Sequence, residues 1–104
     1  MFPPESTCDD IYVTRVTTGS RRVIACEFND GAEYRTFDMT PLLDREPFHA
    51  LVDEAVFRTV DCHYGVPSWN DETIDIAPEY IYENGTRIDR EEFLKYMEAA
   101  NETS

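Results

Sequence analysis

The sequence predicts an α+β fold: an antiparallel β-meander and a second short β-hairpin, with small helices packed on the sheet and a C-terminal helix. Three observations predict it. Segments near the start alternate between β-branched or aromatic and polar residues, a strong hairpin turn joins two of them, and apolar side chains recur with helical spacing near the end of the chain. The length of 104 residues suits one domain.

The first three segments predict the meander. Residues 11–16 are rich in β-branched and aromatic side chains, and residues 22–28 place Ile24, Cys26 and Phe28 on one face of a second strand. The Asn29-Asp30-Gly31 turn follows, because glycine accepts the positive φ that such turns need. Residues 33–37 then return as a third strand. We expect one face of this meander to be exposed to solvent.

The middle of the chain predicts short helices and the second hairpin. Pro41 stands at the first position of a short helical turn. Residues 47–55 predict one amphipathic helix, since four apolar residues share a face at i, i+3, i+4 and i+7. These residues are Phe48, Leu51, Val52 and Ala55. Residues 59–63 and 66–69 predict paired strands around a turn at Gly65.

The end of the chain contains the clearest helix signal. Asp89 with Glu92 forms a capping box, and Ile88 with Phe93 forms a hydrophobic staple, so residues 89–100 are predicted to be helical. One face of this helix carries Phe93, Tyr96, Met97 and Ala100. Before it, residues 80–88 fit either a helix that stops at Asn84-Gly85 or a tight hairpin. The predicted organisation is a lead-in at 1–10, one α+β domain at 11–82 and an extension at 83–104.

Charge narrows the classes of partner. The chain has 9 Lys and Arg against 22 Asp and Glu, a formal net charge of -13, most of it after residue 40. Nucleic acids and anionic membrane surfaces both need cationic side chains, so direct binding to either is disfavoured. A basic protein partner is favoured instead. The oligomeric state leaves no signal in the sequence.

The cysteines and the start of the chain indicate a cytoplasmic protein. The three cysteines are odd in number and lack CxxC spacing, so a disulfide framework is not expected. The opening MFPPESTCDD has acids and prolines where a signal peptide has a basic and then an apolar run. No apolar stretch approaches the ~20 residues of a membrane-spanning helix.

Catalytic and metal-binding patterns are weak. Cys62 and His63 are adjacent on a predicted strand, so their side chains point to opposite faces and cannot easily act on one substrate. Phosphate-binding glycine loops and the HExxH zinc motif are absent from the sequence. Four residues remain for an alternative in which the protein is a metal-dependent enzyme: Asp61, His63, Asp71 and Asp75. The favoured interpretation is a protein without catalytic residues or a cofactor.

The stretch VPSWNDETIDIAPEYIY, residues 66–82, contains the only tryptophan and several acids but no Lys or Arg. Trp69, Ile74 and Ile76 are predicted to close the core, and Trp69 can also contact a partner if one edge of its ring packs and the other is exposed. The acids are predicted to face outward. The candidate partner-binding residues are Trp69, Asp71, Glu72, Asp75 and Glu79.

The order of several motifs resembles the "domain of unknown function 2442" family of small bacterial proteins. The matching features are the Asp30-Gly31 turn, the segment DMTPLL at 38–43, the stretch from Trp69 to Asp75, and PEYIY at 78–82. The resemblance covers Tyr12 to Tyr82 and leaves the helix at 89–100 as an addition. The resemblance implies an α+β fold with no established catalytic residue. It also implies that the protein is a partner of a small toxin-like protein encoded beside it.

Charge, missing catalytic motifs and the resemblance together favour a non-catalytic acidic protein-binding module. Its role would be that of a regulatory or antitoxin-like partner of a basic protein. A second hypothesis is a nucleic-acid mimic that inhibits a DNA- or RNA-binding protein. The metal-dependent enzyme is the third.

Overall fold

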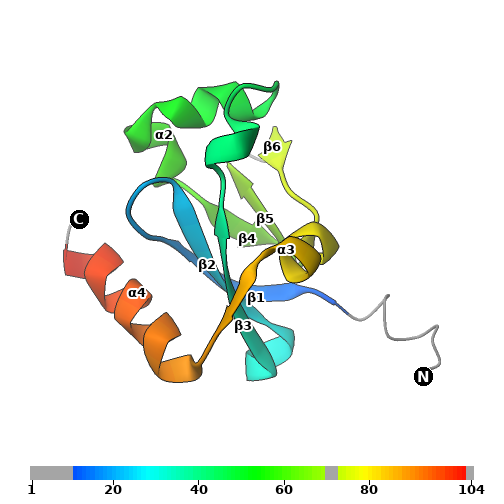
Figure 1. The fold of residues 1–104 in the computed structure, drawn as a ribbon, viewed down its shortest axis with the longest axis vertical. Coiled ribbons are helices and arrows are strands. Elements are labelled where there is room, and N and C mark those ends of the chain that lie inside the picture. Colours follow the sequence, from blue (N-terminus) through cyan, green and yellow to red (C-terminus); the bar gives the residue numbers. More distant parts are fainter. Residues whose placement is uncertain (1–10, 70–72, 103–104) are drawn as a thin grey trace.

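The computed structural model describes residues 11–69 and 73–102, which form two antiparallel sheets and several short helices (Figure 1). The four-stranded sheet has the order β1 (Val13–Thr18), β2 (Val23–Phe28), β3 (Glu33–Asp38) and β7 (Thr86–Ile88). The three-stranded sheet contains β4 (Asp61–His63), β5 (Val66–Trp69) and β6 (Ile74–Asp75). The helical elements are η1 (Asn29–Gly31), η2 (Thr40–Leu42), η3 (Phe48–Val52), α2 (Glu54–Phe57), α3 (Pro78–Asn84) and α4 (Arg90–Glu102). The predicted α+β fold is confirmed.

The meander is closed by a turn whose residues tolerate left-handed backbone. Asn29, Asp30 and Gly31 have φ values of 50°, 59° and 104°, in the region that Asn, Asp and Gly accept most readily. The turn brings β2 and β3 together in unbroken register, from Phe28 opposite Glu33 to Val23 opposite Asp38.

The main core lies between one face of the four-stranded sheet, the small sheet and the helices η3, α2 and α3. Its members are Val13, Ile24, Cys26, Phe28, Phe37, Met39, Leu51, Phe57, Trp69, Ile74, Ile76 and Ile81. The predicted inward face of β2, with Ile24, Cys26 and Phe28, is confirmed. Burial of this apolar set is the main driving force for folding.

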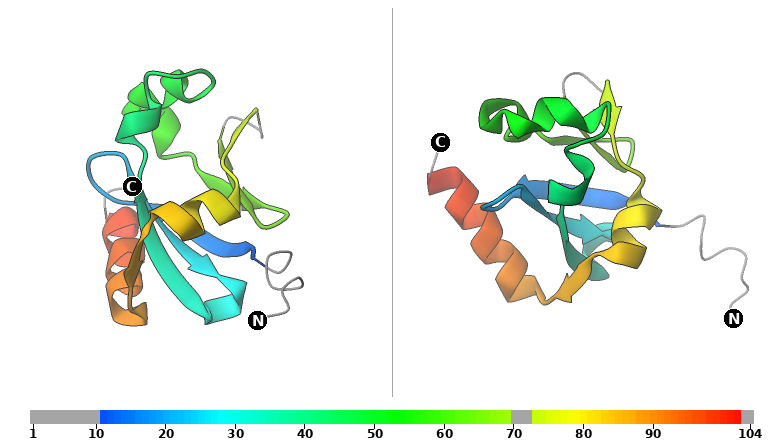
Figure 2. Two further views of the ribbon diagram at one scale, coloured as in Figure 1. Left: turned by 45° about the vertical axis from the view of Figure 1, so that its right-hand side comes forward. Right: turned by 45° about the horizontal axis from the view of Figure 1, so that its top comes forward.

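The prediction that one face of the meander meets solvent is wrong. That face holds Ala25 and Tyr34, and both are buried against Phe93 of α4. Figure 2 shows α3 and α4 on opposite sides of the sheet, so both faces are covered. Glu27 and Thr36 lie on this covered face. Their polar side chains make the sequence pattern of β2 and β3 resemble that of a sheet with one solvent-exposed face.

Residues 47–55 do not form the single amphipathic helix that the sequence predicts. Asp53 adopts an extended conformation, with φ -75° and ψ 116°, and separates η3 from α2. Its side chain accepts a hydrogen bond from the backbone N–H of Ala55 at 3.0 Å, and thereby caps α2. Leu51 and Phe57 are buried, whereas Val52 and Ala55 are exposed.

The segment 80–88, left open by the sequence, is a helix end followed by a strand. Helix α3 stops at Asn84, and Gly85 lies so close to β3 that an added Cβ would be 2.5 Å from the carbonyl oxygen of Thr36. Strand β7 then pairs with β3. Residues 86–102 therefore add a fourth strand and a covering helix to the sheet. In the described part of the chain, no helix is long and apolar enough to cross a membrane.

The start of α4 shows the Asp89 half of the predicted capping box. Oδ1 of Asp89 accepts a hydrogen bond from the backbone N–H of Glu92 at 2.8 Å. Phe93 is completely buried, and Ile88, Tyr96 and Met97 pack around it. Together these contacts fix the helix to the sheet.

We expect Phe93→Ala to lower the free energy of unfolding by about 3–5 kcal/mol, because it removes the buried ring that packs α4 against the sheet and leaves a cavity. Urea unfolding followed by circular dichroism measures the change. Leu94→Ala is the matched control on the same helix, with an exposed side chain, and should change stability by less than about 1 kcal/mol. Equal effects of the two substitutions would show that α4 is not anchored through Phe93.

Candidate functional site: an acidic surface bearing exposed tyrosines

Trp69 belongs to the core, and its side chain is only 1% exposed. Its indole N–H donates a hydrogen bond to the backbone carbonyl of Phe57 at 2.8 Å, and the two rings stack with their centroids 6.3 Å apart. Ile74 and Ile76 are buried with it. The prediction that these three residues close the core is confirmed, and in this conformation Trp69 offers a partner almost no surface.

The described acids of the predicted site face outward. Asp75 and Glu79 are exposed, while Asp71 and Glu72 lie outside the described residues. Glu83 is exposed one helical turn after Glu79, on the same helix. None of Asp75, Glu79 and Glu83 forms an ion pair with another residue that the structure describes.

Asp61 and His63 lie on the same face of β4, with an imidazole nitrogen 3.6 Å from a carboxylate oxygen. Ser68 of β5 stands opposite Asp61 on one side and Asp75 on the other, so these three positions form a row across the small sheet. Within residues 11–69 and 73–102, no group of three or more His, Cys, Asp or Glu is arranged to hold a metal ion. The fourth candidate ligand, Asp71, is outside those ranges.

The two described cysteines are buried or half-buried thiols. Burial raises the pKa of Cys26 strongly, and burial also raises the pKa of Cys62. The Cys62 thiol donates to the backbone carbonyl of Val13 at 2.8 Å. Because the thiolate is the nucleophilic form, this environment holds both groups in the unreactive state.

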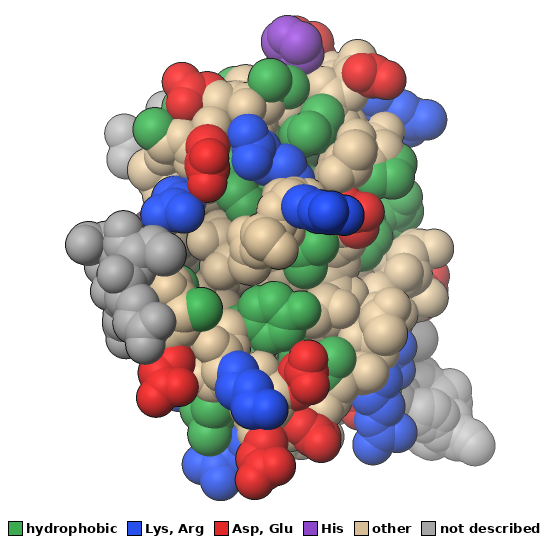
Figure 3. All heavy atoms as spheres, turned by 60° about the vertical axis from the view of Figure 1, so that its left-hand side comes forward, with side chains coloured by type: hydrophobic (Ala, Val, Ile, Leu, Met, Phe, Trp, Pro, Cys, Tyr) green, Lys and Arg blue, Asp and Glu red, His purple; other side chains and the backbone are tan. Residues whose placement is uncertain are grey.

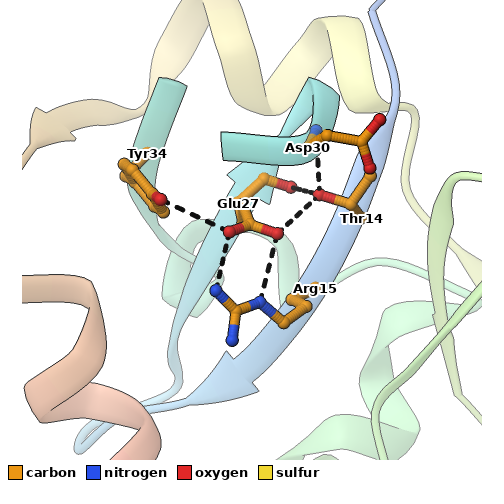
Figure 4. A network of polar contacts seen from close by, with 5 residues as sticks. All are labelled: Thr14, Arg15, Glu27, Asp30 and Tyr34. Carbon is orange, nitrogen blue, oxygen red and sulfur yellow. Dashed lines mark hydrogen bonds and ion pairs between the residues drawn. The ribbon is translucent and has the colours of Figure 1, made fainter. Parts of the chain in front are cut away.

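The most organised polar cluster, centred on Glu27, was missed by the sequence reasoning. Strand β1 has a bulge between Val13 and Arg15, so Thr14 and Arg15 both face Glu27 of β2. The Glu27 carboxylate accepts hydrogen bonds from Thr14 Oγ1 at 2.8 Å, from Arg15 Nε and Nη2 at 3.1 and 2.7 Å, and from the Tyr34 hydroxyl at 3.3 Å (Figure 4). The only sequence signal was an acid in the middle of an otherwise apolar strand.

This cluster is suited to holding the fold together. Hydrogen bonding to Arg15 lowers the pKa of Glu27 despite the opposing effect of burial, with smaller contributions from Thr14 and Tyr34. Glu27 is therefore ionised at neutral pH and cannot donate a proton to a substrate. The guanidinium of Arg15 also lies over the Phe93 ring, 5.3 Å from its centroid, and connects the buried carboxylate to α4.

Charge on the molecule is divided between two regions. Residues 59–86 contain six Asp or Glu residues and no Lys or Arg, and we call them the acidic segment. Its described parts form β4, β5, β6, α3 and the first residue of β7. Figure 3 views the molecule from the side of α4, where Lys and Arg side chains are interspersed with Asp and Glu. All nine cationic side chains belong to residues outside the acidic segment.

The exposed aromatic side chains concentrate at the acidic segment. Tyr64 at the tip of the β4–β5 hairpin is 98% exposed, and Tyr80 on α3 is 44% exposed. Tyr12, at the start of β1, is 39% exposed and contacts the hairpin at Gly65. Exposed carboxylates and exposed tyrosine rings on the acidic segment are groups suited to cationic ligands.

Comparisons of this chain with models of known protein families, with curated proteins and with solved structures found no significant match. No residue role can therefore be transferred from a relative. The family resemblance stays a prediction, and function has to be inferred from the residues of the chain itself.

We expect Glu27→Gln to lower the free energy of unfolding at neutral pH by about 1–3 kcal/mol, since it leaves Arg15 without its partner. Because the folded pKa of Glu27 is lowered, its contribution is present above the unfolded pKa and is lost as pH falls toward the folded pKa. The stability difference between the wild type and the variant should therefore shrink on acidification, as measured by urea unfolding between about pH 7 and about pH 3. Glu98→Gln, an exposed control, should show neither effect. A pH-independent difference for Glu27→Gln would contradict the ionic role.

Proposed function

We propose that this protein is a non-catalytic acidic protein-binding module that binds a basic segment of a protein partner through the acidic segment. One observation carries the proposal: the acidic segment has no Lys or Arg, and its exposed Asp75, Glu79 and Glu83 form no ion pair with a described residue. A cationic partner would supply the charges that this surface lacks.

Arg22 and Arg35 are held by contacts other than the carboxylates of the acidic segment, which supports this proposal. Arg22 donates to the backbone carbonyls of Leu51 and Val52, and Arg35 pairs with Glu33 while its guanidinium lies 4.4 Å from the centroid of the Tyr82 ring. Neutralising the acidic segment with these side chains would break those contacts. An external cation relieves the repulsion between the carboxylates without that loss.

The exposed tyrosines add contact area to the electrostatic attraction. A tyrosine ring has few rotatable bonds, so ordering it on binding costs little entropy, and tyrosine is enriched in binding hot spots. Binding would mask the cationic surface of the partner, which gives the module a regulatory or antitoxin-like role. The free thiols Cys26 and Cys62 support a reducing, cytoplasmic location for this role.

We expect a fluorescein-labelled octa-lysine peptide to bind at low ionic strength, with affinity that falls as salt is added. Removing two charges from the acidic segment with Glu79→Gln and Glu83→Gln should weaken binding by roughly three- to tenfold. The measurement is fluorescence anisotropy.

The matched control removes two exposed charges elsewhere, with Asp44→Asn and Glu98→Gln. Both double variants have the same net charge. If the peptide bound only through the overall charge of the protein, it would therefore lose equal affinity for each variant. Equal losses, or no binding of the peptide to the wild type, would contradict the proposed function.

A further inference from the structure

The β4–β5 hairpin turns through Tyr64 and Gly65, and both residues have positive φ, 53° and 79°. Two-residue turns of this kind require positive φ at both central positions and favour Asn-Gly or Asp-Gly. Gly65 suits its position, but a tyrosine in the left-handed region is strained by its Cβ. The fold therefore holds an unfavourable residue at the first position of the turn.

Nothing within the described structure compensates for this strain. The Tyr64 side chain is 98% exposed, so it buries almost no apolar surface. It takes part in no hydrogen bond, ring contact or ion pair with another described residue. Uncompensated strain of this kind clusters at functional sites, which makes Tyr64 a candidate for a role outside folding.

The tip that carries Tyr64 is rigidly attached to β1. The backbone N–H of Val13 donates to the carbonyl of Gly65 at 2.9 Å, and an added Cβ on Gly65 would be 2.8 Å from the Cβ of Tyr12. The Tyr12 hydroxyl in turn donates to Oδ2 of Asp30 at 2.9 Å. The ring of Tyr64 is thus presented on a fixed backbone, which lowers the entropy lost on binding.

Two exposed carboxylates belong to the elements that hold the tip. Asp61, on the same hairpin, pairs with His63 at 3.6 Å, and Asp30 accepts a hydrogen bond from the Tyr12 hydroxyl. The acidic segment contributes no Lys or Arg. An aromatic face attracts cations through its quadrupole, and a guanidinium also stacks flat on the ring and forms directed hydrogen bonds with carboxylates. An ammonium group lacks the planar stacking and the forked geometry.

We propose that the Tyr64 tip docks an arginine side chain of the basic partner. This inference rests on the proposed function and adds to it a preference for arginine over lysine. The general charge of the acidic segment attracts both cations, whereas Tyr64 distinguishes between them.

The test compares labelled octa-arginine and octa-lysine peptides by fluorescence anisotropy at one ionic strength. We expect the wild type to bind octa-arginine about three- to tenfold more tightly than octa-lysine. Tyr64→Asn should abolish this preference and raise Tm by about 2–6 °C, because asparagine suits the turn. Tyr64→Phe keeps the ring and should keep the preference. Val52→Asn, which alters an exposed apolar residue outside the acidic segment, should leave it unchanged.

Each other outcome has a distinct meaning. If Tyr64→Asn binds both peptides as the wild type does, the arginine-docking inference is overturned and the proposed function stands. If Tyr64→Asn lowers Tm, Tyr64 serves the fold and the inference is also overturned. If the wild type binds neither peptide, the proposed function itself fails.

Discussion

A buried carboxylate imposes the central constraint on this structure. Glu27 sits on a sheet face that α4 covers, and an ionised group there is tolerated only with a charged partner and several hydrogen bonds. The bulge in β1 provides them by turning both Thr14 and Arg15 toward Glu27. Arg15 then meets Phe93, so the ion pair, the bulge and the position of the C-terminal helix depend on one another.

The same principle explains how charge is distributed over the molecule. Arg15, Arg22 and Arg35 are engaged around the four-stranded sheet by a carboxylate, by backbone carbonyls and by an aromatic ring. In the small sheet, the indole of Trp69 donates a hydrogen bond to a backbone carbonyl within an apolar core. Asp75, Glu79 and Glu83 of the acidic segment form no ion pair with another described residue, and the proposed binding function depends on these carboxylates.

Local signals in the sequence were sufficient for several strands, turns and caps, whereas non-local contacts were not predictable. The turn at Asn29-Asp30-Gly31 and the cap at Asp89 depend on a few neighbouring residues, and both formed as predicted. The break at Asp53 was missed because the apolar period suggested one helix. The Glu27 cluster depends on a bulge that no pattern marks, and the exposure of Tyr64 depends on which residues occupy a two-residue turn. The sequence included Trp69 in the candidate site, and the structure places its ring in the core, whereas Asp75 and Glu79 of that site are exposed.

The most direct test of the account is to map where a basic ligand binds. Amide chemical shifts of the isotope-labelled protein, followed by nuclear magnetic resonance during titration with octa-arginine peptide, give that location residue by residue. We predict that the largest shift changes lie in residues 59–86 and at Tyr12, with Tyr64 and Gly65 among them, and that α4 changes little. Shift changes centred on α4, or spread evenly over all exposed acids, would contradict it.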